Sequence, residues 1–264
     1  MGVIVGGGGY GPRLAAEIRR AGYPTIEYSW TPFNGGRRWV SPTDLDDVIK
    51  IFLEDGVTDL LHAGTFSVAQ ILLGGAPIFW RPATLAQVFL TRRGMRGGFF
   101  QPYDKRLETA GLRLRTAPEL FDAYRPVRGA MGQTRPLSGE LPRLARLKAI
   151  ALGELARRDS QLHLPQAVIF DDEEPVHWER WGTDRLCRQA RLTAKGAARR
   201  TLVKVLPPGM PPMLDPPTIG THTVVEAKAA GVDVIALDTL HGLIIDRTAT
   251  AAQADAAGIV LCGI

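Results

Sequence analysis

A proline-rich segment in the last quarter of the chain presents one carboxylate directly before a predicted helix. The segment is Pro207–Thr223, PPGMPPMLDPPTIGTHT, and its acid is Asp215. Because proline fixes its own φ and restricts the residue before it, Asp215 is biased towards an extended backbone. The spacing Thr223-Val224-Val225-Glu226 is typical of a capping box, so a helix is expected to begin there and to end at Gly231.

A carboxylate beside a helix N-terminus suggests a phosphoester that a metal ion bridges to the acid. Free N–H groups and the helix macrodipole favour an anion at that place. A second N-terminus of this kind is predicted after Gly182, where Thr183 or Asp184 would cap a helix. The alternative for Asp215 is a loop-stiffening or capping role, and the local chemistry leaves both interpretations open.

A glycine-rich turn follows the first predicted strand. Gly2–Val5 is a short apolar run, and the glycines of GGGGYG after it satisfy G-x-G-x-x-G through Gly6, Gly8 and Gly11. Such glycines let a backbone approach a phosphate closely. Dinucleotide binding also needs an acid about 20 residues further on, and Glu27 is the only candidate, lying slightly early. The interpretation of the chain as an NAD-dependent oxidoreductase therefore depends on the glycine turn alone.

The composition is that of a globular protein with an excess of arginine. The chain has 264 residues, 45% of them hydrophobic and 22% charged, with a net charge of +5. A run of about 18 apolar residues, which a transmembrane helix needs, is absent from the sequence. The basic excess fits an anionic partner or simply solvated faces, and the sequence contains no recognised nucleic-acid-binding module. Cys187 and Cys262 have no metal-like spacing and are expected to be reduced thiols of a cytosolic protein.

The order of predicted elements indicates an α/β protein with two domains. Residues 1–130 are predicted as a Rossmann-like domain with a parallel sheet, and residues 131–140 as a linker. Residues 141–264 are predicted as a second α/β domain with a mixed sheet. The four acids Asp171–Glu174 are interpreted as a solvated turn between two strands rather than a cation site.

Several motifs of the second half occur together in one known family. Asp215–Gly220, DPPTIG, followed by Thr223 is close to D-L-P-T-I-G…T, Gly182–Asp184 matches a G-T-D core, and Val203-Lys204 matches a V-K pair. With these motifs the chain resembles the LpxI-type UDP-2,3-diacylglucosamine pyrophosphatases of lipid A biosynthesis. The resemblance covers essentially the whole chain and is most specific in its last 65 or so residues.

The resemblance implies two α/β domains and a hydrolase that acts on a phosphoric anhydride. The implied reaction is the metal-dependent hydrolysis of UDP-2,3-diacylglucosamine, or of a related nucleotide-diphospho-sugar lipid, to UMP and a sugar 1-phosphate. The alternative is a catalytically altered nucleotide-sugar-binding or regulatory homologue, because Trp181 and Pro207 stand where the family has an acid and a lysine.

The resemblance also assigns roles to individual residues. The expected catalytic residues are Asp215, Lys204 and Thr218, and the expected ligands of Mg²⁺ or Mn²⁺ are Asp215, Asp184 and Asp238. The expected substrate-binding residues are Gly6, Gly7, Gly8, Gly64, Thr183 and Thr223.

The implied partner is a lipid-linked nucleotide sugar, and a nucleic acid is not expected. The resemblance implies a cytoplasmic protein, and it leaves open a peripheral contact with the inner membrane and a homodimer.

Overall fold

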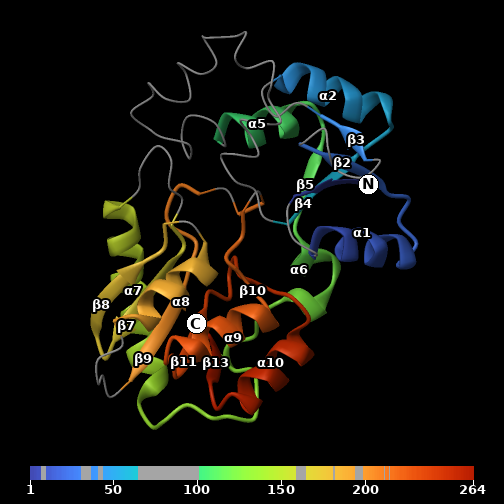
Figure 1. The fold of residues 1–264 in the computed structure, drawn as a ribbon. Helices are drawn as coiled ribbons and strands as arrows, with labels where there is room; N and C mark the ends of the chain where they lie inside the picture. Colours follow the sequence, from blue (N-terminus) through green and yellow to red (C-terminus); the bar gives the residue numbers. More distant parts are fainter. Residues whose placement is uncertain are drawn as a thin grey trace. The chain divides into compact units, whose positions relative to one another are not determined.

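The structure is a computed structural model of the 264-residue chain (Figure 1). It describes every residue except 7–9, 31–36, 41–43, 65–100, 159–164, 181, 194–198, 211 and 214, and it leaves out the side chains of 101–103. The chain forms two compact units. The first contains Met1–Leu120 and Met210–Asp215, and the second contains Phe121–Gly209 and Pro216–Ile264.

The first unit is built on a parallel sheet of five strands in the order β3-β2-β1-β4-β5. This is the order of one half of a Rossmann fold continued by the first strands of the other. The prediction of a parallel sheet in the N-terminal part is therefore confirmed. The strands are β1 (Gly2–Val5), β2 (Ile26–Ser29), β3 (Arg38–Trp39), β4 (Asp59–Ala63) and β5 (Arg113–Arg115).

The helices of the first unit bury one apolar stripe each. In α1 (Tyr10–Arg20) the buried residues include Leu14, Ala15 and Ile18, which follow helical spacing. In α2 (Leu45–Glu54), Val48 and Phe52 are buried, and the Phe52 ring meets the edge of Tyr28 at 4.7 Å between centroids. Two further described helices are α5 (Gln101–Thr109) and α6 (Ala117–Leu120).

The second unit contains a mixed sheet in the order β13-β11-β9-β7-β8. The three strands β9, β11 and β13 are parallel, whereas β7 runs antiparallel to β9 and β8 antiparallel to β7. The predicted mixed sheet is thus confirmed. Of the four acids, Asp171 ends β7, Glu174 begins β8, and Asp172 and Glu173 form the turn between them. The strands are β7 (Ala167–Asp171), β8 (Glu174–Trp178), β9 (Arg200–Lys204), β11 (Val234–Leu237) and β13 (Val260–Gly263).

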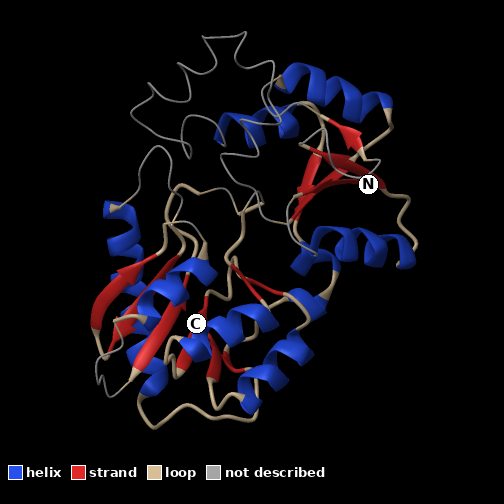
Figure 2. Cartoon of the chain, viewed as in Figure 1, coloured by secondary structure: helices blue, strands red, loops and turns tan. Residues whose placement is uncertain are grey.

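Helices cover both faces of this sheet (Figure 2). Helix α7 (Glu140–Arg157) packs on one face, and α8 (Thr183–Arg191), α9 (Thr221–Ala229) and α10 (Arg247–Ala256) pack on the other. Because side chains of a strand alternate between faces, Leu202 of β9 belongs to the core under α8 and α9, while Val203 belongs to the core under α7. Because of this alternation, polar residues at neighbouring positions of a strand lie on opposite faces of the sheet and belong to different sites.

Short elements complete the second unit. The strands β10 (Thr218–Ile219) and β12 (Leu243–Ile244) form a separate parallel pair. The 3-10 helix η3 (Asp122–Tyr124) and strand β6 (Gly129–Ala130) precede α7. Within the described ranges, none of the helices combines the length and the apolar character needed to cross a bilayer.

The segment predicted as a linker, residues 131–140, is attached to the second unit. The Met131 N–H donates to the Leu261 carbonyl at 2.8 Å, and the Asp255 carboxylate accepts from Gln133 N and Thr134 N at 2.9 and 2.7 Å. The division between the two units falls earlier in the chain, between Leu120 and Phe121.

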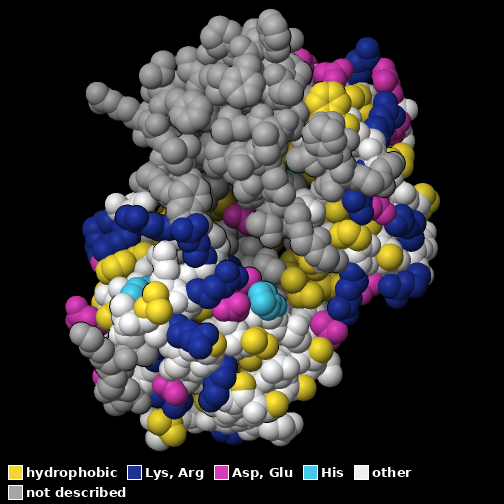
Figure 3. All heavy atoms as spheres, in the orientation of Figure 1, with side chains coloured by type: hydrophobic (Ala, Val, Ile, Leu, Met, Phe, Trp, Pro, Cys, Tyr) yellow, Lys and Arg dark blue, Asp and Glu magenta, His cyan; other side chains and the backbone are white. Residues whose placement is uncertain are grey.

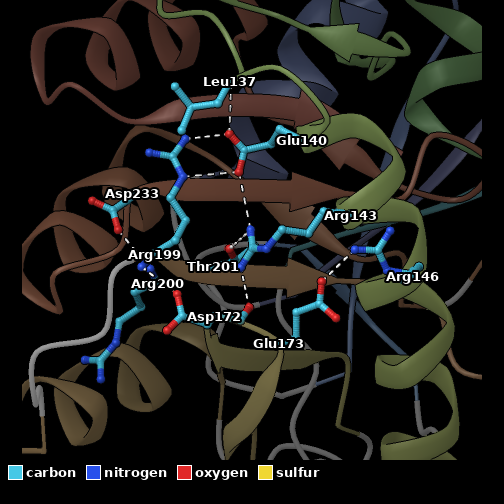
Figure 4. Close-up of polar contacts among 10 residues, drawn as sticks. All are labelled: Leu137, Glu140, Arg143, Arg146, Asp172, Glu173, Arg199, Arg200, Thr201 and Asp233. Carbon is cyan, nitrogen blue, oxygen red and sulfur yellow. Dashed lines mark hydrogen bonds and ion pairs between the residues drawn. The ribbon is translucent and has the colours of Figure 1, made fainter.

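A buried carboxylate fixes the start of α7 (Figure 4). The Glu140 side chain, 3% exposed, accepts from Arg199 Nε and Nη2 at 3.1 and 2.6 Å and from Leu137 N at 3.1 Å. Arg143 adds a contact of 3.3 Å to Glu140 and also donates to Thr201 Oγ1 at 3.1 Å. These bonds tie the first turn of α7 to the start of β9.

Candidate functional site

A buried lysine ends the central parallel strand of the second unit. Lys204 is the last residue of β9, and its register partner on β11 is Leu237, which packs in the core under α8 and α9. Lys204 therefore points to that face of the sheet. Its ammonium Nζ donates to the hydroxyl of Thr183 at 2.5 Å, and each of these residues is 6% exposed.

Thr183 begins α8 but does not cap it. Gly182, with φ of 95°, is the N-cap, so the predicted capping by Thr183 or Asp184 is wrong. The Thr183 hydroxyl instead donates to Glu179 Oε1 at 3.3 Å while it accepts from Lys204. The other oxygen of Glu179 accepts from the Gln166 N–H at 3.0 Å. The result is a buried polar chain of ammonium, hydroxyl and carboxylate at the N-terminus of α8.

The N-cap of the neighbouring helix α9 lies three residues before the predicted one. Gly220 is the N-cap and Thr221 the first helical residue, so Thr223 is the third residue of the helix. Its hydroxyl accepts from the Gly220 N–H at 3.4 Å. The predicted N-cap at Thr223 is therefore wrong: the hydroxyl reaches back from inside the first turn.

A histidine that the sequence analysis did not single out joins the two helix N-termini. His222 Nε2 lies 3.3 Å from Asp184 Oδ2 of α8 and 3.8 Å from Glu226 Oε1 of α9. Arg188 Nε is 3.4 Å from the same oxygen of Glu226. The only signal in the sequence was the position of His222 within the G-T-H-T motif at the helix start. On the face that carries these helices, Figure 3 shows Lys and Arg side chains over much of the second unit.

Asp238 lies on the opposite face of the sheet from Lys204. It follows β11 directly, is 4% exposed, and accepts from Lys148 Nζ of α7 at 2.7 Å and from Leu240 N at 3.3 Å. Asp184 belongs to α8 on the other face. The two carboxylates therefore do not share one metal ion.

The described residues do not fit the predicted Mg²⁺ or Mn²⁺ site. They contain no group of three or more His, Cys, Asp or Glu side chains that could hold a metal ion. Asp184 faces the imidazole of His222 and Asp238 faces the ammonium of Lys148, so both predicted ligands already have nitrogen partners. Asp215, which is half-buried and grouped with the first unit, keeps its role only as a prediction.

Thr218 is engaged with its own loop. Its hydroxyl donates to the Pro216 carbonyl at 2.8 Å, at the start of β10. The hydroxyl oxygen retains acceptor lone pairs but its proton is used. A catalytic role of Thr218 stays a prediction.

In the first unit, two predicted glycines follow neighbouring parallel strands. Gly6 comes after β1 and donates its N–H to the Ala63 carbonyl of β4 at 2.7 Å, and Gly64 follows β4 with φ of 107°. Gly7 and Gly8 lie outside the described residues. Gly11 allows close packing, since a Cβ there would lie 2.6 Å from the Ala63 carbonyl oxygen.

Glu27, the acid that dinucleotide binding would require, is already paired with two arginines. Glu27 of β2 pairs with Arg19 and lies 2.7 Å from Arg37 Nε. A ribose hydroxyl would have to displace these two cations, so Glu27 does not fit the NAD interpretation.

Comparison with known families identifies the second unit. Residues 135–262 match the family model described as the LpxI C-terminal domain. Residues 135–262 are therefore a C-terminal domain of the LpxI type. The predicted resemblance is confirmed, and the family suggests a hydrolase and a connection with lipid A biosynthesis.

The other comparisons add no assignment. No curated protein matches the sequence significantly. A solved structure titled "CobK precorrin-6A reductase" covers 100% of this chain and 86% of its own, with 12% identity and a TM-score of 0.34. We draw no conclusion on fold or activity from a likeness at this level.

The predicted substrate requires a correction. The family match covers residues 135–262 and names a domain rather than a substrate. The assignment of UDP-2,3-diacylglucosamine or a related lipid as the substrate is therefore not upheld. What remains is the LpxI-type domain and the polar site at its sheet edge.

Proposed function

We propose that the second unit binds a phosphorylated ligand at Lys204 and the N-terminus of α8. One observation carries the proposal: Lys204 is 6% exposed, and its ammonium meets a neutral hydroxyl rather than a carboxylate in the part of the chain that the structure describes. The nearest described carboxylate in this chain of hydrogen bonds, that of Glu179, is separated from the ammonium by the Thr183 hydroxyl. A buried charge without a direct counter-charge is costly, so an anionic ligand in contact with Lys204 would stabilise the site. Among the described residues the ammonium donates one hydrogen bond, so two of its three N–H donors are available to a ligand there.

The N-terminus of α8 supports the same ligand class. The helix begins at Thr183 beside Lys204, and its first N–H groups have no partner within the helix. Helix N-termini bind phosphate through these groups and through the macrodipole. The negative charge of Asp184 would oppose an anion there, but the imidazole of His222 faces that carboxylate. The site therefore fits a phosphate group better than a neutral sugar.

For the reaction, we propose a hydrolase that acts on a phosphoric anhydride. The family supports the class of hydrolase, and the lysine supplies charge neutralisation, which phosphoryl transfer needs more than a covalent nucleophile. Lys204 would hold oxygens of one phosphoryl group, and Thr183 would fix the position of the lysine through its hydroxyl.

Binding is tested by calorimetric titration of the full chain with inorganic pyrophosphate and a nucleoside diphosphate. Lys204→Met removes the charge and keeps the length of the side chain. Since charge-assisted hydrogen bonds contribute about 1.5–3 kcal/mol, affinity should fall by about 10-fold or more. The control is Lys228→Met, which removes an exposed lysine from the last turn of α9 and should leave affinity unchanged.

The outcomes separate binding from hydrolysis. If Lys204→Met melts like the native chain and binds pyrophosphate equally well, the binding proposal is wrong. Release of orthophosphate from the same compounds, measured with and without Mg²⁺, tests the reaction. Binding without release of orthophosphate would support the proposed ligand class and refute the proposed hydrolase activity. Asp215→Asn in the same assay tests the predicted catalytic role of Asp215.

A further inference from the structure

We propose a second binding site, for a small organic anion with an apolar tail, on the α7 face of the second unit. A cavity of about 680 Å³ lies there, which is within the range of small-molecule pockets. Its walls come from α7, from β6 and from the residues that follow β11 and end β13. Ligands of open α/β sheets bind outside the carboxyl ends of parallel strands, and β11 and β13 end at this cavity.

This cavity is distinct from the site at Lys204. Leu237 and Lys204 are register partners and share a face, so Asp238, one residue further, turns to α7. There it meets Lys148, which lines the cavity. The sheet therefore separates the two sites.

Two cations line the cavity and retain unused donors. Lys148 Nζ donates to Asp238 Oδ1 at 2.7 Å and to the Ile264 carbonyl at 3.0 Å, which leaves one of its three N–H groups for a ligand. The exposed Arg128 guanidinium has no polar partner among the described residues. Because Asp238 pairs with Lys148, Arg128 is the described lining side chain whose positive charge has no carboxylate side chain as a partner, and it would bind a monoanionic head group.

The backbone around Arg128 is held in place. Arg128 forms a parallel β-bridge with Gly263 of β13, and three residues further on the Met131 N–H donates to the Leu261 carbonyl at 2.8 Å. A Cβ at Gly263 would lie 2.0 Å from the Val127 carbonyl oxygen, so only glycine permits this approach. Gly129 has φ of 87°, which turns the chain out of the bridge. The guanidinium is thus presented from a fixed backbone at the rim of the cavity.

The remaining wall is apolar and exposed. Leu141, 45% exposed, with Pro142 and Ala145 forms the side of the cavity that belongs to the first turns of α7. A methylene chain lying on this wall would gain about 0.8 kcal/mol for each CH₂ group that it buries. Charge at one end and an apolar wall at the other select an alkyl carboxylate or alkyl phosphate over a free inorganic anion.

The test uses hexanoate and hexyl phosphate as probes, with hexanol as the uncharged analogue, followed by saturation-transfer NMR on the full chain. We expect saturable binding of an anionic probe, at least fivefold weaker binding of hexanol, and a fivefold or greater loss with Arg128→Gln. Ala145→Trp, at an exposed helix position, fills the cavity and should abolish binding. The matched control Arg146→Gln, whose partner Glu173 lies outside the cavity, should change nothing.

The results test whether the site exists, which head group it binds and whether it is separate from the site at Lys204. Binding that survives Ala145→Trp, or no saturable binding of either anion, overturns the proposal, and equal affinity for hexanol overturns its electrostatic part. A preference between the two anions identifies the head group as carboxylate or phosphate monoester. Hexanoate binding that persists in Lys204→Met supports two separate sites, whereas its loss there would contradict them.

Discussion

Removing the charge of Glu140 tests whether the buried ion pairs at the start of α7 stabilise the second unit. Glu140→Gln keeps the size of the side chain but leaves Arg199 without its carboxylate, together with the contact from Arg143 (Figure 4). Breaking a buried ion pair typically costs about 3–5 kcal/mol. Arg199 is 24% exposed and Arg143 keeps its bonds to Thr201 and Asp172, so we expect a smaller cost than this, about 2–3 kcal/mol.

The assay is urea denaturation followed by circular dichroism, at pH 7 and at lower pH. The matched control is Glu173→Gln, because the pair of Glu173 and Arg146 is about half exposed on both sides and such pairs contribute less than about 1 kcal/mol. If Glu140→Gln and Glu173→Gln lose the same free energy of unfolding, Glu140 does not stabilise α7 through its ion pairs.

The pH dependence gives an independent measurement. Burial alone would raise the pKa of Glu140, but the hydrogen bonds from Arg199 and Leu137 and the charges of Arg199 and Arg143 outweigh it and hold the pKa below its ordinary value of 4.5. A carboxyl with a lowered pKa in the folded state stabilises the protein above its ordinary pKa and loses that contribution as pH falls. The difference between the native chain and Glu140→Gln should therefore narrow below pH 4.5. A difference that stays constant down to acid unfolding would refute this assignment.

Three further substitutions test the elements that position the sites. Arg200→Met should cost about 3 kcal/mol of unfolding free energy in urea, because the buried guanidinium pairs with Asp171 and donates to the carbonyls that end α8 and α9. His222→Ala should weaken pyrophosphate binding by about 0.5–1 kcal/mol in calorimetry, since the negative charge beside the α8 N-terminus loses its facing imidazole; unchanged affinity would place the histidine outside the site. Gly11→Ala should lower the unfolding free energy by about 1–3 kcal/mol through its clash with Ala63, whereas Gly153→Ala, with no neighbour closer than 3.7 Å, should raise it.

The sequence predicted the architecture because strand and helix periodicities are local. The strand at 2–5 and the glycine turn after it are apparent from an apolar run and its boundary. The motif residues Lys204 and Thr183 were both singled out, and the structure brings them into contact. Here the family motif and the local chemistry agree.

The register of the sheet separates Asp238 from the other described residues that were predicted for the site. Lys204 and Asp238 both follow the apolar part of a strand, which made them look equivalent in the sequence. In the sheet Lys204 pairs with Leu237, and their side chains lie on the same face. Asp238 is the next residue after Leu237, so its side chain lies on the opposite face. Register is set by the packing of distant segments, so a single sequence does not display it.

Helix starts were misplaced for a related reason. A hydroxyl bonds the N-terminal N–H groups either from the N-cap or, reaching back, from the third residue of the helix. Thr223 does the second, and Gly220 takes the N-cap with an extended backbone. Both arrangements put the same residue types within three positions of each other, and only the backbone conformation distinguishes them.

The two lysines at the carboxyl edge of the sheet suggest why one unit would hold two different anions. Lys148 pairs with Asp238, so the cavity on the α7 face offers the charge of Arg128 and a wall of apolar side chains. Lys204 faces a hydroxyl, with Glu179 one bond further away, beside a helix N-terminus. The positive potential should therefore be stronger on the α8 face, which suits the multiple charges of a phosphoric anhydride. Raising the salt concentration should weaken pyrophosphate binding more steeply than hexanoate binding, and equal salt dependence of the two would contradict this division of charge.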